Sequence, residues 1–215
     1  MLAAILLGVA LSAEPLTAQN YLAKMSPGIN LGNTLEAIPA QTSWGNPKPT
    51  QAHMDGVRKA GFRSIRIPAA WSQYADADHR IQKEWMENVA KVVAMAQKAG
   101  LYVLLNVHWD GGWMQPTLAH QEKVHAKLAA FWKQIGERFK DADHTLLFAG
   151  TNEVGVEGEY TEPKPENAKI QTTFNQVFVD TVRKTGGKNA DRWLVVQAYN
   201  TNIGLAAKFN STMPK

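Results

Sequence analysis

Short apolar runs that end in polar side chains recur along this chain, and this repeat constrains its fold most strongly. The run Leu146–Ala149 is continuous and apolar, which is typical of a strand buried on both faces of a parallel sheet, and it is soon followed by Asn152 and Glu153. Four further runs of this kind predict strands at residues 28–31, Ser64–Ile67, 102–107 and 193–197.

Amphipathic segments separate the predicted strands. Residues 83–99, 122–139 and 168–185 carry apolar side chains at helical spacing, and Thr50 is predicted to cap a shorter helix that ends at Gly61. Strands and helices alternate with a strand-to-strand spacing of roughly 35–45 residues, which predicts parallel βαβ units with right-handed crossovers. Polar groups follow every predicted strand, so the pattern favours a (β/α)8 TIM barrel over an open doubly wound sheet.

The number of predicted strands is five, whereas a closed barrel of this kind has eight. At the observed spacing, the remaining units would need roughly 100 or more further residues. The sequence therefore predicts an α/β barrel that is incomplete, with about five βα units. It also predicts that residues 193–197 form a long, flat, apolar sheet edge, a feature that invites aggregation.

Composition excludes several classes of function. The net charge is only +4 and the basic residues are scattered, so nucleic acid is not a predicted partner. The chain has no cysteine, which excludes disulfides and thiol catalysis. His120 and His125 are five positions apart and off a common helical face, so no metal site is predicted. Residues 28–33 do not match the dinucleotide fingerprint.

The N-terminus has the pattern of an export signal. Its first residues are apolar, and the small residues Ser12, Ala13 and Ala18 offer cleavage positions, which predicts a signal peptide over residues 1–18 and a secreted or periplasmic protein. The apolar run is too short to span a bilayer, and no other stretch is predicted to do so. The alternative interpretation is an apolar N-terminal helix.

Three polar positions are the first candidates for chemistry. Glu153 lies just past a buried strand, where α/β folds keep their functional groups. Arg66 stands inside an otherwise apolar strand, and a buried guanidinium needs an anionic partner. His108 follows the run 102–107, beside Trp109 and Asp110.

Four segments, in order, resemble the strand-end motifs of family 5 glycoside hydrolases, particularly bacterial endoglucanases. They are Gly-Ile-Asn-Leu-Gly-Asn-Thr-Leu at 28–35 with Trp-Gly at 44–45, Ala-Gly-Phe-Arg-Ser-Ile-Arg-Ile-Pro-Ala-Ala-Trp at 60–71, Leu-Asn-Val-His-Trp-Asp-Gly-Gly-Trp at 105–113, and Thr-Asn-Glu at 151–153. The resemblance covers about residues 25–200. It implies that residues 19–215 are part of a catalytic domain that hydrolyses a β-1,4-glucan by double displacement without a cofactor.

The resemblance also implies a role for each strand-end residue. Glu153 would be the general acid/base, first protonating the glycosidic oxygen and then activating water. Asn152 would hydrogen-bond the sugar 2-hydroxyl, and Arg66 would orient the nucleophilic carboxylate. His108 would line the sugar site, and Asn30 would support the network at the strand ends.

Tryptophans are the predicted substrate contacts. Trp44, Trp71 and Trp113 are candidate sugar platforms, with core packing as the alternative for each. Trp109 occupies the position at which many relatives carry a second histidine, and it is also assigned to the substrate site.

The sequence offers no second catalytic carboxylate. Retaining hydrolysis needs two carboxyl groups about 5–5.5 Å apart, and the resemblance implies that the second comes from a seventh strand. The later acidic residues lie in a predicted loop, on a helix or before a strand (Glu157, Glu159, Glu162, Glu166, Asp180, Asp191). We therefore expect the 215-residue chain alone to be inactive. The alternatives are a non-catalytic carbohydrate-binding remnant and a piece that does not fold alone.

Overall fold

The computed structural model describes residues 17–159 and 162–209, so the predicted signal peptide lies almost wholly outside the described residues. One parallel sheet has five strands whose order along the sheet equals their order in the chain. This order has no switch point and confirms the wall of an α/β barrel rather than a doubly wound sheet. The strands are β1 (Gly28–Asn30), β2 (Ser64–Ile67), β3 (Tyr102–Asn106), β4 (Leu146–Ala149) and β5 (Leu194–Val195).

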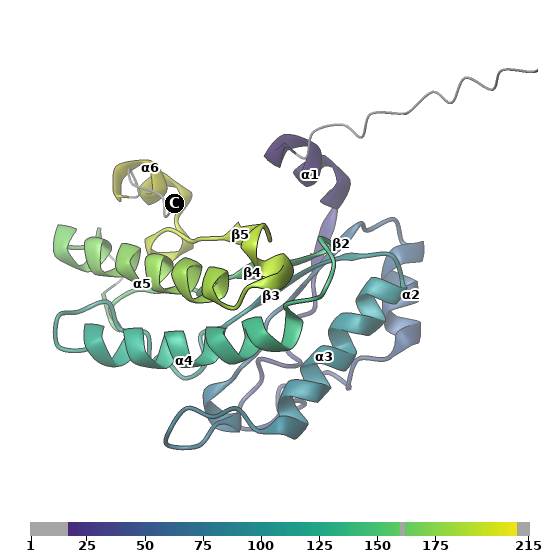
Figure 1. Ribbon diagram of the computed structural model, residues 1–215, viewed down its shortest axis with the longest axis horizontal. Coiled ribbons are helices and arrows are strands. Elements are labelled where there is room, and N and C mark those ends of the chain that lie inside the picture. Colours follow the sequence, from purple (N-terminus) through teal and green to yellow (C-terminus); the bar gives the residue numbers. More distant parts are fainter. Residues whose placement is uncertain (1–16, 160–161, 210–215) are drawn as a thin grey trace, which may run out of the picture.

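A helix follows each of the first four strands, and α3, α4 and α5 lie along one side of the sheet (Figure 1). The predicted helices are confirmed, although α5 begins at Pro165, ahead of the predicted start at residue 168. Proline suits the first helical position because its missing N–H would have no intrahelical partner there. The four helices are α2 (Gln51–Lys59), α3 (Lys83–Lys98), α4 (Gln121–Phe139) and α5 (Pro165–Lys184).

Alternation along the strands decides which side chains reach the site. Ile65 and Ile67 are fully buried against the helices, whereas Arg66 between them faces the other side of the sheet and is half-buried. The whole of β4 is buried, as its continuous apolar sequence predicted. The sheet register pairs Asn30 with Arg66, so their side chains share one face.

Elements that the sequence did not predict lie at the ends of the sheet. In helix α1 (Ala18–Met25), the Tyr21 ring packs against Tyr102 and Trp193, with ring centroids 5.3 and 5.4 Å apart, and its hydroxyl donates to the His144 carbonyl. These partners stand at the amino ends of β3 and β5, so α1 covers the end of the sheet opposite the candidate site. The other unpredicted elements are η1 (Ser72–Tyr74), η2 (Gly187–Ala190), η3 (Tyr199–Thr201) and α6 (Ile203–Phe209).

The prediction that residues 193–197 form a long sheet edge is wrong. Strand β5 contains only Leu194 and Val195, both half-buried, and the backbone turns into η3 soon after. A two-residue edge offers few unpaired backbone groups for another chain, so the aggregation hazard inferred from the sequence is much reduced.

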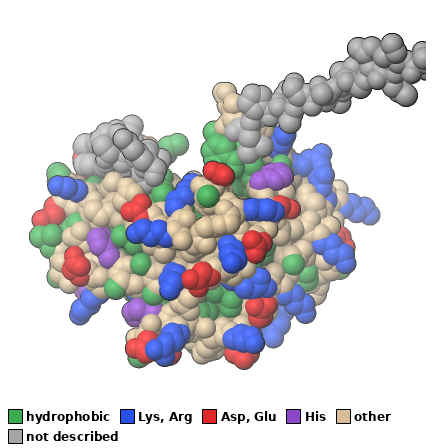
Figure 2. Space-filling view, viewed as in Figure 1, with side chains coloured by type: hydrophobic (Ala, Val, Ile, Leu, Met, Phe, Trp, Pro, Cys, Tyr) green, Lys and Arg blue, Asp and Glu red, His purple; other side chains and the backbone are tan. Residues whose placement is uncertain are grey.

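The outer surface of the described ranges carries charges of both signs. In Figure 2, Lys and Arg side chains are intermingled with Asp and Glu across the visible face. Within residues 17–159 and 162–209, no helix is both long and apolar enough to cross a membrane.

A buried arginine, Arg192, links α4, η2 and the beginning of β4 by hydrogen bonds. Arg192 is only 4% exposed, and its guanidinium lies 5.0 Å from the Phe148 ring. All five of its hydrogen bonds go to neutral oxygens of α4, η2 and the approach to β4: Asn189 Oδ1 (2.6 Å) and the carbonyls of Asp143 (3.0 Å), Leu146 (2.7 Å), Phe139 (3.0 Å) and Ala142 (2.7 Å).

We expect Arg192→Met to lower the free energy of unfolding by about 3–5 kcal/mol, because it leaves several buried carbonyls without donors. Urea unfolding of the full-length protein measures the loss. Arg80→Met is the matched control: Arg80 is exposed and pairs with Asp76 and Asp78, so the expected change is about 0–1 kcal/mol. Equal losses for the two variants would contradict this view of Arg192.

Candidate active site

A polar network centred on Arg66 joins the carboxyl ends of β1 to β4. Arg66 Nη1 donates to Asn30 Oδ1 at 2.7 Å, and Nη2 donates to Asn152 Oδ1 at 2.6 Å. Arg66 Nη2 also lies 3.4 Å from His108 Nδ1. Residues from four neighbouring strand ends therefore meet at one rim of the sheet, as the sequence pattern predicted.

Arg66 fixes the orientation of both amides. A guanidinium can only donate, so the oxygen rather than the nitrogen of Asn30 and Asn152 must face it. Asn152 is 4% exposed, and its Nδ2 is buried with no hydrogen-bond partner in the described part of the chain. A buried amide donor without a partner is costly, and it marks a position where a ligand oxygen would be stabilised.

The neighbours of His108 determine its tautomer. Its Nδ1 lies 3.3 Å from Asn106 Nδ2 and 3.4 Å from Arg66 Nη2, and both of these atoms are donors. Nδ1 is therefore the acceptor, and the ring proton resides on Nε2. Burial, and secondarily the charge of Arg66, lowers the pKa of His108 to about 4, so the ring is neutral at pH 7 and keeps an N–H to donate.

This shift predicts a loss of stability in acid. The folded state resists protonation of His108 down to about pH 4, whereas the unfolded state takes up the proton near pH 6.5. The free energy of unfolding should therefore be unaffected by His108 above pH 6.5 and should decrease as the pH falls from 6.5 towards 4. We expect the unfolding temperature of His108→Asn to depend less on pH between 6.5 and 4 than that of the wild type. An unchanged pH dependence would contradict the conclusion that His108 is buried in its neutral form.

The side chain of Glu153 is exposed, and its backbone is held in place by a hydrogen bond. Its φ of 50° lies in the left-handed region, which is strained for a residue other than glycine, and its N–H donates to Thr201 Oγ1 at 3.2 Å. Two residues on, a Cβ at Gly155 would come within 1.8 Å of Asn200 Oδ1, so only glycine fits there. The β4–α5 loop and η3 thus interlock around Glu153.

Glu153 lines a cleft of about 450 Å³. Trp109 is 43% exposed and lines this cleft with Glu153, Gln115 and Asn200. The volume is that of a small-molecule site, and it combines a flat aromatic surface with a carboxylate. Trp109 and Glu153 therefore share one site, in keeping with their assignment from sequence.

The expected anionic partner of Arg66 is missing from residues 17–159 and 162–209. The hydrogen-bond acceptors of its guanidinium are all neutral: the amides of Asn30 and Asn152 and the ring of His108. Burial lowers the pKa of Arg66, opposed by the more distant charges of Glu36 and Glu153. A carboxylate at this rim would offset the cost of removing the Arg66 guanidinium from water. Within the described ranges, no group of three or more His, Asp or Glu side chains is placed to hold a metal ion.

The structure corrects one of the predicted sugar platforms. Trp71 is fully buried and its Nε1 donates to the Asn106 carbonyl at 3.0 Å, so it packs in the core and cannot stack on a sugar. Trp113 is half-buried and lines a different cavity from Glu153. Trp44 is 44% exposed in the loop between β1 and α2, where its face is accessible.

Sequence reasoning missed two buried carboxylates that shape the rim loops. Glu36 is 5% exposed and accepts from the backbone N–H groups of Asn33 (2.6 Å) and Thr34 (2.9 Å). Asp110 accepts from the Trp71 N–H at 3.0 Å, and burial raises its pKa. The available signal was an acidic residue inside a turn-forming segment, where backbone donors need an acceptor.

The sheet order and the rim together define a protein of the α/β-barrel class with its polar site at the carboxyl ends of the strands. The chain belongs to the cellulase family, glycosyl hydrolase family 5, whose family model matches residues 29–215.

The similar proteins are glucanases of greater length. The chain is 46% identical to a xyloglucan-specific endo-β-1,4-glucanase of Bacteroides ovatus, over 93% of this chain and 42% of that protein. It is 37% identical to endoglucanase A of Clostridium longisporum, over 87% of this chain and 39% of that protein. The structure of a Bacteroides ovatus family 5 xyloglucanase with a XXXG heptasaccharide superposes with a TM-score of 0.90 at 45% identity, covering 94% of this chain and 46% of that chain. The chain thus spans less than half the length of these relatives.

Proposed function

We propose that the protein hydrolyses β-1,4-linked glucan with retention of configuration, and that Glu153 is its general acid/base. The observation that carries the proposal is the position of Glu153: it lines the cleft with Trp109 and directly follows Asn152, which Arg66 holds at the same rim. Membership in the cellulase family supports the same chemistry.

In the proposed first step, a carboxylate attacks the anomeric carbon while Glu153 protonates the departing glycosidic oxygen. In the second step, Glu153 takes a proton from water, the water oxygen attacks the anomeric carbon, and the enzyme carboxylate leaves. Asn152 Nδ2 is the free donor for the sugar 2-hydroxyl. Arg66 would orient the nucleophilic carboxylate, for which the described residues provide no candidate beside its guanidinium.

We also propose that xylose-branched glucans are among the substrates, because the similar proteins are named as xyloglucan-specific or as endoglucanases. Release of reducing ends by the full-length protein from xyloglucan, carboxymethylcellulose, mannan and xylan tests this. We expect turnover on the two glucans, with the β-anomer as first product by NMR. Activity confined to mannan or xylan would contradict the substrate, and an α-anomer would contradict retention.

Export is a further part of the proposal. Cleavage after residue 18 would leave helix α1 almost intact, since α1 begins at Ala18. N-terminal sequencing of the mature protein from the medium or periplasm should give a start near residue 19. A mature protein that retains Met1 would contradict export by a cleaved signal.

A further inference from the structure

A second cavity, of about 510 Å³, lies beside α4 and is distinct from the Glu153 cleft. Only Gln115 lines both. The second cavity has one aromatic wall and several basic groups: Trp113, His79, His120, Lys123 and Lys127. Among the described residues that line it, none is acidic.

Lys127 is the unusual group in this cavity. Its ammonium is half-buried, 4.6 Å from the centroid of the Trp113 ring and 5.6 Å from that of Phe131. The ion pairs of residues 17–159 and 162–209 do not include Lys127. Burial lowers its pKa, and only the distant charge of Asp110 opposes this. A cation that loses solvation without a counter-ion is destabilised, and a bound anion would relieve that cost.

Asp110 is not free to pair with Lys127. Its carboxylate accepts from the backbone N–H groups of Trp71 (3.0 Å) and Ser72 (2.8 Å) and from Trp113 Nε1 (3.2 Å). These bonds anchor Trp113 and so fix the ring over which Lys127 lies. Lys127 is therefore positioned by cation–π contacts with Trp113 and Phe131, but the ion pairs of the described residues give it no counter-ion.

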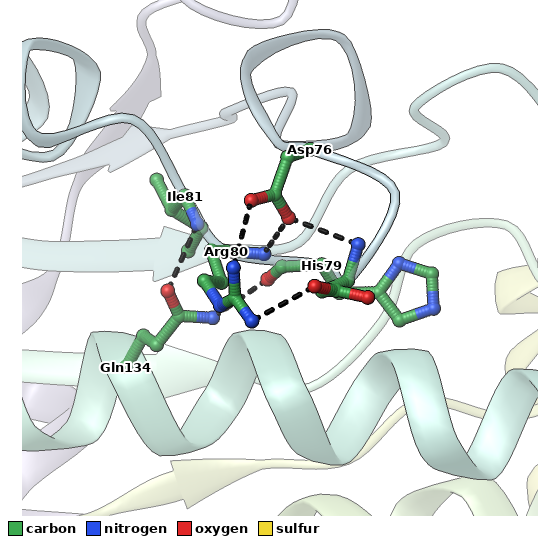
Figure 3. A network of polar contacts seen from close by, with 6 residues as sticks. Asp76, His79, Arg80, Ile81 and Gln134 are labelled. Atoms are coloured by element: carbon green, nitrogen blue, oxygen red, sulfur yellow. Dashed lines mark hydrogen bonds and ion pairs between the residues drawn. The ribbon is translucent and has the colours of Figure 1, made fainter.

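The loop that carries His79, another lining residue, is also held in place by hydrogen bonds. Figure 3 shows Gln134 reaching from α4 to the loop that carries His79. Gln134 Nε2 donates to the His79 carbonyl at 2.8 Å, and the Ile81 N–H donates to Gln134 Oε1 at 2.9 Å. The His79 ring stands edge-on to Phe131, with centroids 6.1 Å apart. Hydrogen bonds thus hold the loop that carries His79 against α4.

We propose that this cavity binds a carboxylate-bearing sugar, a uronic acid unit, with the carboxylate paired to Lys127. The half-buried ammonium of Lys127 suits a carboxylate, whereas phosphate sites favour arginine forks, and none of the described residues that line this cavity is an arginine. The volume suits a small molecule, and Gln115 and His120 offer partners for hydroxyl groups. The choice of a sugar as the carrier of the carboxylate rests on the proposed function.

Calorimetric titration of the full-length protein with methyl β-glucuronide and with methyl β-glucoside tests the proposal without any variant. We expect the glucuronide to bind at least about tenfold more tightly, since the two sugars differ in the charged group. Equal affinity for the two sugars would overturn the proposal. So would inorganic phosphate binding as tightly as the glucuronide, because charge alone would then suffice.

Variants locate the site. Lys127→Met should weaken glucuronide binding by about tenfold or more. Lys133→Met, at an exposed position further along α4, should not change it. Glu153→Gln should also bind the glucuronide normally, because Glu153 does not line this cavity. Unchanged binding in Lys127→Met would refute the assignment, and binding is read here independently of glucan hydrolysis, so failure of the proposed function would be seen separately.

Discussion

Replacing Glu153 with glutamine in the full-length protein is expected to lower kcat on β-1,4-glucan by about 10²–10⁴-fold. Glutamine keeps the shape of the side chain but can neither give up a proton to the departing oxygen nor accept one from water. The exposed position of Glu153 and its backbone anchor at Thr201 mean that the fold should not depend on its charge. The measurement is the steady-state release of reducing ends.

The size of the loss should depend on the leaving group. The dinitrophenolate of a dinitrophenyl glycoside leaves without being protonated. The first step on this substrate should therefore be far less affected by Glu153→Gln than the first step on glucan. Glu137→Gln is the control, because Glu137 is exposed on α4 and makes only a long ion pair of 3.9 Å with Lys133. If Glu153→Gln kept wild-type turnover on glucan, Glu153 would not be the acid/base.

Arg66→Ala should abolish turnover in the full-length protein while leaving sugar affinity largely intact. The substitution removes the donors that face Asn30 and Asn152 and the charge proposed to orient the nucleophile. A misplacement of about 1 Å can cost 10²-fold in rate, so we expect kcat to fall by about 10²-fold or more with little change in affinity for an oligosaccharide. Single-turnover kinetics and calorimetry separate the two effects.

Two further substitutions make this result specific. Arg63→Ala removes an exposed arginine that precedes the same strand, at the end away from the rim, and should leave kcat unchanged. Arg66→Lys keeps the charge but cannot reproduce the two-pronged donor geometry, so it should resemble Arg66→Ala more than the wild type. Wild-type turnover in Arg66→Ala would remove Arg66 from the site.

Local pattern was sufficient to predict most of the framework. The apolar run of β4 and the helical spacing in α3 and α4 are encoded within each segment, and the apolar neighbours of Arg66 in β2 marked its guanidinium as one that needs partners. The rim followed from the topology, because the carboxyl ends of parallel strands lie at one edge.

The errors arose where distant parts of the chain decide the outcome. Trp71 is buried because Asn106 and the loop after β3 close over it, which its own segment does not encode. Strand β5 is short because the turn at Asn200 interlocks with the β4–α5 loop. Glu36 was missed although it lies in a turn-forming segment, because its partners are backbone N–H groups whose positions are set by the folded loop.

The stereochemistry of azide rescue tests the central claim about Glu153 most directly. The full-length Glu153→Ala protein is incubated with dinitrophenyl β-cellobioside and azide, and the product is identified by NMR. Azide entering the space of the lost carboxylate should attack the covalent intermediate from the face used by water, giving faster turnover and a β-glycosyl azide. An α-glycosyl azide would instead identify Glu153 as the nucleophile, and no azide product would show that its carboxylate takes no part in the reaction.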